Sequence, residues 1–262
     1  MNSLAHREAG TGIPLVLIHA YPLDSAMWQQ QLGALSGAFR VLVPDVFGFG
    51  ESPLPAEEWT MDSMAEAIAA LLDRLAIEGK IILGGLSMGG YIALSFAKRY
   101  PDRLRGLILA DTRADGDSPE AKVARGETIE FVRKHSAAAQ IEKMLPKMLS
   151  ANTQVQRADI VECVRTLGSK QSVPAVVAAL AALRDRPDST TALKSFDFPT
   201  LVMVGEQDAI TPPALAEAMI RELKRGSLEV IPSAGHLSNL EAPEAFNFAV
   251  RNWLTTITAL ES

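Results

Sequence analysis

The chain has 262 residues, of which 48% are hydrophobic and 21% are charged, as is ordinary for a soluble globular protein. Its formal net charge of −6, with no long basic stretch, disfavours nucleic-acid binding. The first ten residues lack the apolar core of a secretory signal, and the single cysteine, Cys163, cannot form an intrachain disulfide, so we expect a cytoplasmic protein.

Short apolar runs rich in β-branched residues predict the strands of a mostly parallel, doubly wound sheet that is covered on both faces. The expected buried strands are 14–19, 40–44, 80–83, 106–110, 200–204 and 228–231, and residues 2–8 are a candidate edge strand. Helical patterns lie between them at 61–75, 87–99, 213–223 and 242–253. Alternating strands and helices predict right-handed βαβ crossovers and an α/β fold.

One long segment, 114–195, contains no strand-like run and is rich in helical patterns. We interpret it as a helical cap inserted into an α/β core made of residues 1–113 and 196–262. Trp28, Phe131, Met144 and Met148 are candidate pocket-lining residues. The alternative is that the methionines and leucines of this segment only pack the core.

The most informative local pattern is Gly85-Leu86-Ser87-Met88-Gly89, a G-x-S-x-G motif inside the uncharged stretch 81–97. In this motif a serine occupies a sharp strand-to-helix turn that exposes its hydroxyl at the edge of a sheet. The stretch is slightly short for a membrane span, which needs about 20 apolar residues, and it contains four glycines. We therefore expect no membrane span and take Ser87 as the candidate nucleophile.

A serine nucleophile needs a base and an orienting carboxylate, which in this kind of sheet follow it in the order serine, acid, histidine. Asp208 lies in the loop after strand 200–204, and His236 lies in the loop after strand 228–231. Asp111 and Glu206 are weaker candidates for the acid. The other three histidines, at positions 6, 19 and 135, are poorer candidates for the base.

Acyl transfer also needs donors for the developing oxyanion. The backbone N–H of Met88, directly after the nucleophile, and that of Tyr21, in the loop after strand 14–19, are the candidates. The sequence contains no phosphate-binding loop, no complete dinucleotide loop and no cluster of metal-ligand residues. We expect no cofactor and no metal.

These residues resemble the α/β-hydrolase family across essentially the full chain. The resemblance is carried by 19–24 (HAYPLD), 44–52 (PDVFGFGES), 85–90 (GLSMGG), 205–208 (GEQD) and 235–236 (GH). Segments 85–90 and 24–28 are similar to those of small capped carboxylesterases and 3-oxoadipate enol-lactonases. One departure is Ala20, where the family usually has glycine.

The resemblance implies a serine carboxylic ester hydrolase that acts on a small or medium ester. Two alternatives stay open, a lactonase and a non-catalytic ligand-binding protein of the same fold. An acidic lactone would favour an arginine facing the pocket, and Arg113, Arg125 and Arg133 are available. Perhydrolysis, with peroxide as the acyl acceptor, stays open as a side activity, and the oligomeric state is not predicted.

Overall fold

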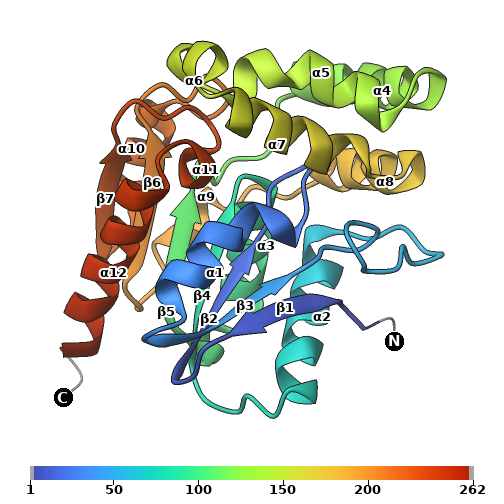
Figure 1. Ribbon diagram of the computed structural model, residues 1–262. Coiled ribbons are helices and arrows are strands. Elements are labelled where there is room, and N and C mark those ends of the chain that lie inside the picture. The colour runs from blue at the N-terminus through green and yellow to red at the C-terminus, as the bar shows by residue number, and fades with distance from the viewer. Residues whose placement is uncertain (1–2, 260–262) are drawn as a thin grey trace.

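A seven-stranded sheet with helices on both faces forms the centre of the computed structural model, which describes residues 3–259 (Figure 1). The strand order is β1-β3-β2-β4-β5-β6-β7, with β1 antiparallel to β3 and all other neighbours parallel. The strands are β1 (His6–Ala9), β2 (Ile13–Ile18), β3 (Phe39–Pro44), β4 (Ile81–Leu86), β5 (Leu104–Ala110), β6 (Thr200–Gly205) and β7 (Gly226–Ile231). The predicted α/β class with a mostly parallel sheet is confirmed.

Every predicted strand is present. The runs 14–19 to 228–231 correspond to β2 to β7, and the expected edge strand begins at His6. Asn2, the first residue of that expectation, lies outside the described residues, as do positions 1 and 260–262 of the expected core. The expectation that β7 is buried is wrong, because this last strand pairs with β6 alone and leaves Val230 43% exposed.

Helices connect the strands and cover the sheet. They are η1 (Ser25–Trp28), α1 (Gln29–Leu35), α2 (Met61–Arg74), α3 (Met88–Arg99), η2 (Pro101–Arg103), α4 (Pro119–Lys134), α5 (Ala137–Met148), α6 (Ala151–Gln156), α7 (Ala158–Ser169), α8 (Val173–Arg184), α9 (Thr190–Leu193), α10 (Pro213–Glu222), α11 (Ser238–Glu241) and α12 (Pro243–Ala259). The four helices predicted outside 114–195 are α2, α3, α10 and α12. The short helices η1, α1, η2 and α11 were not predicted.

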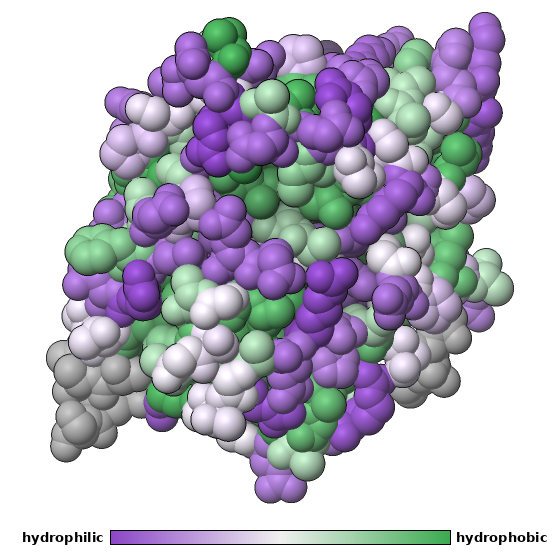
Figure 2. Space-filling model, in the orientation of Figure 1, coloured by the Kyte–Doolittle hydropathy of each residue, from purple (hydrophilic) through white to green (hydrophobic). Residues whose placement is uncertain are grey.

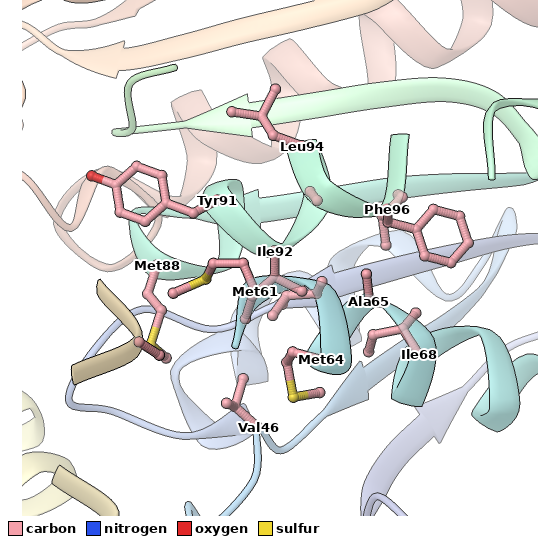
Figure 3. Close-up of a cluster of buried hydrophobic side chains, with 14 of the residues drawn as sticks. Val46, Met61, Met64, Ala65, Ile68, Met88, Tyr91, Ile92, Leu94 and Phe96 are labelled. Carbon is pink, nitrogen blue, oxygen red and sulfur yellow. The ribbon is translucent and has the colours of Figure 1, made fainter. Parts of the chain in front are cut away.

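Alternate residues of the central strands enter two separate hydrophobic cores. In β2, Val16 and Ile18 belong to the core with α2 and α3, whereas Leu15 and Leu17 belong to the core with α1 and α12. Figure 3 shows the first core, where side chains of α2 and α3 interlock. Because both faces of these strands are buried, their sequences are apolar without alternation. On the face seen in Figure 2, hydrophilic and hydrophobic residues are interspersed, with some hydrophobic ones visible between hydrophilic ones near the centre.

Helices α4 to α8, which we call the cap helices, lie above the carboxyl ends of the strands (Figure 1). Within the described residues, no strand occurs between Ala110 and Thr200. Four of the cap helices begin at a serine whose side chain accepts a hydrogen bond from a backbone N–H of the first turn, namely Ser118, Ser136, Ser150 and Ser172. Such caps satisfy N–H groups that have no intrahelical acceptor and mark where one helix of the segment stops and the next begins.

The uncharged stretch 81–97 is divided at Ser87 into β4 and α3. Among residues 3–259, no helix has both the length and the apolar composition needed to cross a membrane.

At Gly205, the last residue of β6, the backbone lies very close to the loop that follows β7. A Cβ atom there would lie 1.9 Å from the carbonyl oxygen of Gly235, whereas a Cβ at Gly79 would meet nothing within 4 Å. We expect Gly205→Ala to lower the free energy of unfolding by about 1–3 kcal/mol, as overpacking does. The measurement is urea unfolding followed by circular dichroism, with Gly79→Ala as the control. Equal midpoints for the two variants would contradict the prediction.

Candidate active site

Ser87 occupies a strained backbone conformation between β4 and α3, with φ 54° and ψ −112°. The turn brings α3 against β4 and β2 so closely that a Cβ at Gly85 would lie 2.1 Å from the carbonyl carbon of Gly89. A Cβ at Gly89 would lie 2.2 Å from the carbonyl oxygen of Ile18. A left-handed serine is uncommon and is kept only where its surroundings impose it. The Thr112 hydroxyl also donates to the Ser87 carbonyl oxygen at 2.9 Å.

Three side chains from separate loops form a chain of hydrogen bonds. Nε2 of His236 lies 2.9 Å from the Ser87 hydroxyl oxygen, and Nδ1 lies 2.8 Å from Oδ2 of Asp208. Asp208 follows β6 and His236 follows β7, and both side chains are buried. If Nδ1 carries the proton, it donates to the carboxylate, and Nε2 is then the acceptor for the serine hydroxyl. This arrangement can transfer the serine proton to the imidazole.

A tight turn fixes the carboxylate of Asp208. Its Oδ1 accepts from the backbone N–H groups of Ile210 and Thr211 at 2.8 and 2.9 Å, and its Oδ2 accepts from the Thr211 hydroxyl at 2.6 Å. Sequence reasoning missed Thr211. The available signal was a threonine three residues after an aspartate in a loop, because aspartates often bond the backbone of the residues that follow them.

The electrostatics of the pair favour an ionised carboxylate beside a basic histidine. Burial, the largest single influence, would lower the pKa of His236, but the charge and hydrogen bond of Asp208, together with the charges of Asp111 and Glu241, raise that pKa above its usual 6.5. Burial likewise opposes ionisation of Asp208, yet His236 and the hydrogen bonds from Thr211 leave its pKa below the usual value. An imidazolium formed at His236 is therefore stabilised where it forms.

Asp111 lies near Asp208 and His236, but its protonation state differs from that of Asp208. It is fully buried, and its oxygens accept from the Gly205 N–H at 2.7 Å and from the Ser238 hydroxyl. Burial, reinforced by the charge of Asp208, raises the pKa of Asp111 to about 8. At neutral pH it is therefore mainly protonated, and it makes no hydrogen bond to His236 within the described residues.

The other weaker candidates lie apart from the serine. Glu206 accepts from the Ser233 N–H at 2.9 Å on an exposed turn. His19 accepts from the Val46 N–H at 2.9 Å, and its Nδ1 lies 3.0 Å from the Ala20 carbonyl. Burial lowers the pKa of His19, so it is a neutral residue that holds the loop containing Tyr21. His6 is in the edge strand β1, and His135 packs on Phe131 at the end of α4.

A cavity of about 310 Å³ opens onto Ser87 and His236. Its lining is mostly supplied by α4, α5 and α8 and consists of Tyr21, Ser87, Tyr91, Asp117, Ala121, Ala124, Arg125, Thr128, Gln140, Met144, Leu180, Leu183, Ile210 and His236. A volume of this size is at the lower end of small-molecule sites. Within the described residues, no group of His, Cys, Asp or Glu side chains is arranged to hold a metal ion.

Of the four predicted pocket residues, the cavity takes in Met144 and leaves out Trp28, Phe131 and Met148. Trp28 packs on Phe246 in the core below η1, with ring centroids 5.9 Å apart. Met148 is fully buried in the same core. Phe131 faces His135 and the Lys143 ammonium instead. Apolar side chains at helical spacing do not reveal from sequence which face of the helix meets a cavity.

The two predicted oxyanion donors, the N–H groups of Met88 and Tyr21, lie at the start of a helix and in a loop beside the cavity. Met88 is the first residue of α3, so its N–H is among those without an intrahelical acceptor. Figure 3 shows Met88 and Tyr91 at that end of α3, with the Tyr91 hydroxyl directed away from the hydrophobic cluster. Tyr21 lies in the loop held by His19, and it lines the cavity with Ser87.

Glu241 joins the histidine loop to the cap helices. Its carboxylate accepts from the Gly235 N–H at 2.9 Å and from the Ser150 N–H at 2.8 Å. Beside this link, the His236 N–H donates to the Met148 carbonyl at 3.0 Å. Sequence reasoning missed Glu241, because a glutamate at a helix end carries no signal of burial.

Comparison with known proteins gives consistent matches. Residues 15–249 match the model of the alpha/beta hydrolase family. A thermophilic esterase from Thermogutta terrifontis, solved with malate bound, is 45% identical, has a TM-score of 0.94, and is covered over 93% of its chain by 97% of this one.

Two curated relatives are similar over most of their length. 3-Oxoadipate enol-lactonase 2 of Acinetobacter baylyi is 29% identical over 90% of this chain and 86% of its own. The pimeloyl-[acyl-carrier protein] methyl ester esterase of Neisseria meningitidis is 31% identical over 91% of this chain and 92% of its own.

Two matched variants distinguish the carboxylates. We expect Asp208→Asn to lower kcat by about 10⁴-fold, because an amide cannot stabilise the imidazolium. Asp111→Asn replaces a protonated acid with a neutral amide, so at pH 7 it should lower kcat by less than about tenfold. Steady-state hydrolysis of an activated ester by both purified variants is the measurement. A larger fall in kcat for Asp111→Asn than for Asp208→Asn would reverse the assignment of the two carboxylates.

The raised pKa of Asp111 also predicts a pH dependence of stability. The folded protein keeps this proton up to about pH 8, whereas the unfolded chain loses it near the usual value of 3.8, so stability is lost as the pH rises through that interval. Asp111→Asn removes this loss. The difference between the unfolding midpoints of the variant and the wild type should therefore shift in favour of the variant as the buffer pH rises from 5 to 8. A constant difference would contradict the raised pKa.

Proposed function

The chain belongs to the alpha/beta hydrolase family, and on that premise we propose that it is a serine hydrolase that cleaves small or medium carboxylic esters. The observation that carries the proposal is the chain of two hydrogen bonds from Ser87 through His236 to Asp208, at the base of a cavity. The esterase relatives support the same reaction class.

In the proposed reaction, the Ser87 oxygen attacks the ester carbonyl while Nε2 of His236 accepts the hydroxyl proton. The tetrahedral intermediate then expels the alcohol, which takes that proton from His236, and an acyl-serine remains. Water, deprotonated by His236, attacks the acyl-serine and releases the carboxylic acid and the free serine. Asp208 holds the imidazole and stabilises its charged form.

The developing oxyanion is assigned to the backbone N–H groups of Tyr21 and Met88. A donor of this kind is typically worth about 3 kcal/mol of transition-state stabilisation. Both are backbone groups, so substitution of either side chain changes the shape of the cavity and leaves the donor in place. Tyr21 is itself one of the residues that line the cavity.

A lactonase is the second candidate. The same three residues open a lactone, with the leaving alcohol retained on the released acid, and the enol-lactonase relative favours this reading. Arg125 lines the cavity and is a cation that a carboxylated lactone would meet, whereas Arg133 pairs with Glu130 on the exposed face of α4. A non-catalytic role gives no reason to retain the complete hydrogen-bonded triad.

The direct test replaces the nucleophile. We expect Ser87→Ala to lower kcat on a short-chain nitrophenyl ester by at least about 10³-fold, and to abolish labelling by a fluorophosphonate probe. Ser36→Ala, at an exposed helix end, is the matched control and should keep both. Wild-type protein should show a burst of nitrophenol as the acyl-serine accumulates. Full turnover by Ser87→Ala would refute the mechanism.

A further inference from the structure

The cap side of the Ser87 cavity carries an incompletely neutralised positive charge. Arg125 of α4 lines the cavity and donates through Nε to Oδ2 of Asp117. The other oxygen of Asp117 accepts from Nη1 of Arg186 at 2.6 Å. One carboxylate thus serves two guanidinium groups. Burial would raise the pKa of Asp117, but the two arginines lower it, so the aspartate stays charged and one positive charge is in excess.

The neighbouring ion pair does not cancel this excess. Arg113 pairs with Asp115, and these two are neutral together. Arg186 also stacks over the ring of Tyr91, 4.3 Å from its centroid, and Tyr91 lines the cavity. Burial raises the pKa of Tyr91, while the charges of Arg186, Arg125 and Arg113 act to lower it. The positive charge of these arginines therefore acts on Tyr91, a residue of the cavity wall.

Two buried polar atoms in the same wall lack partners. The Tyr21 hydroxyl and Oε1 of Gln140 belong to side chains of residues that are only 6% and 5% exposed, and both residues line the cavity. Among the described residues, neither atom makes a hydrogen bond of good geometry, although the Gln140 side chain lies close enough to the Tyr21 hydroxyl to lower its pKa as a hydrogen-bonding neighbour. Unsatisfied buried polar groups are costly, and a ligand that pairs with them recovers that cost.

We propose that this cavity selects substrates that end in a carboxylate, namely monoesters of dicarboxylic acids or lactones that bear a carboxyl group. Arg125 uses Nε for Asp117, and its two terminal nitrogens can form a fork on a carboxylate. The Tyr21 hydroxyl donates to the same group, and rotation of the Gln140 amide presents its NH₂. A single negative charge matches the excess. This inference rests on the proposed function, because Ser87 must cleave the bond.

The test compares two esters of one chain length, the monomethyl ester of a straight-chain dicarboxylic acid and the methyl ester of the corresponding monocarboxylic acid. For wild type, we expect kcat/KM to favour the charged ester at one or more chain lengths. Arg125→Gln should lower the ratio of the two kcat/KM values by about ten- to a hundredfold, mainly through KM, because a charge-assisted pair is lost. Arg125→Lys should restore part of it.

Arg133→Gln is the matched control, since Arg133 is on the same helix but is exposed and outside the cavity lining. It should leave the ratio unchanged. An unchanged ratio in Arg125→Gln, or an equal fall in Arg133→Gln, would overturn the proposal. If Arg125→Gln does not fold, inhibition of wild-type neutral-ester hydrolysis by glutarate and by butyrate decides, with weaker inhibition by glutarate counting against it.

The two proposals fail separately. Turnover of both esters by Ser87→Ala would overturn the proposed hydrolytic mechanism. Ser87-dependent turnover with a ratio that does not depend on Arg125 would overturn only the carboxylate preference.

Discussion

The turn at Ser87 is the constraint on which the rest of the site depends. A buried strand passes directly into a buried helix, and this is possible only because Gly85 and Gly89 carry no side chain where β2, β4 and α3 meet. The strain in the serine backbone is held by packing on both sides. Parallel strands then deliver the loops of Asp208 and His236 to the same edge of the sheet. The sheet topology brings Ser87, Asp208 and His236 together, and the two glycines allow the sharp turn that exposes the Ser87 hydroxyl.

Two buried carboxylates near one histidine have opposite charge states. Asp208 is ionised because its turn supplies three donors and because His236 faces it. Asp111 is equally buried, yet it receives fewer donors and lies within the field of Asp208, so it keeps its proton. The environment, and not the residue type, separates the charged partner of the histidine from the neutral residue behind it.

Most of the fold was predictable from sequence, because strands buried on both faces leave apolar runs in β2 to β6. The strand β7 was found from the short run 228–231, although it is largely exposed. The placement of Ser87, Asp208 and His236 followed from motif and order, because loops after parallel strands share one edge. The cavity wall did not follow. Met144 and Met148 are one helical turn apart on α5, and only the packing of α5 on its neighbours decides which of them meets the cavity. Glu241 accepts from backbone N–H groups, which no sequence pattern indicates, and the one signal for Thr211 was its position three residues after Asp208.

The links from Glu241 to Ser150 and from His236 to Met148 fasten one end of the cap helices to the loop that carries His236. The junction between α5 and α6 is therefore held to the core by two hydrogen bonds. Any outward swing of the cap that began there would pull on the backbone of His236 and displace its ring from the Ser87 hydroxyl. The helices α4 and α8, at the far end of the cap, pack on each other and make no hydrogen bond to the His236 loop among the described residues. Those helices also supply much of the cavity wall, whereas the two hydrogen bonds to the His236 loop are at the other end of the cap helices.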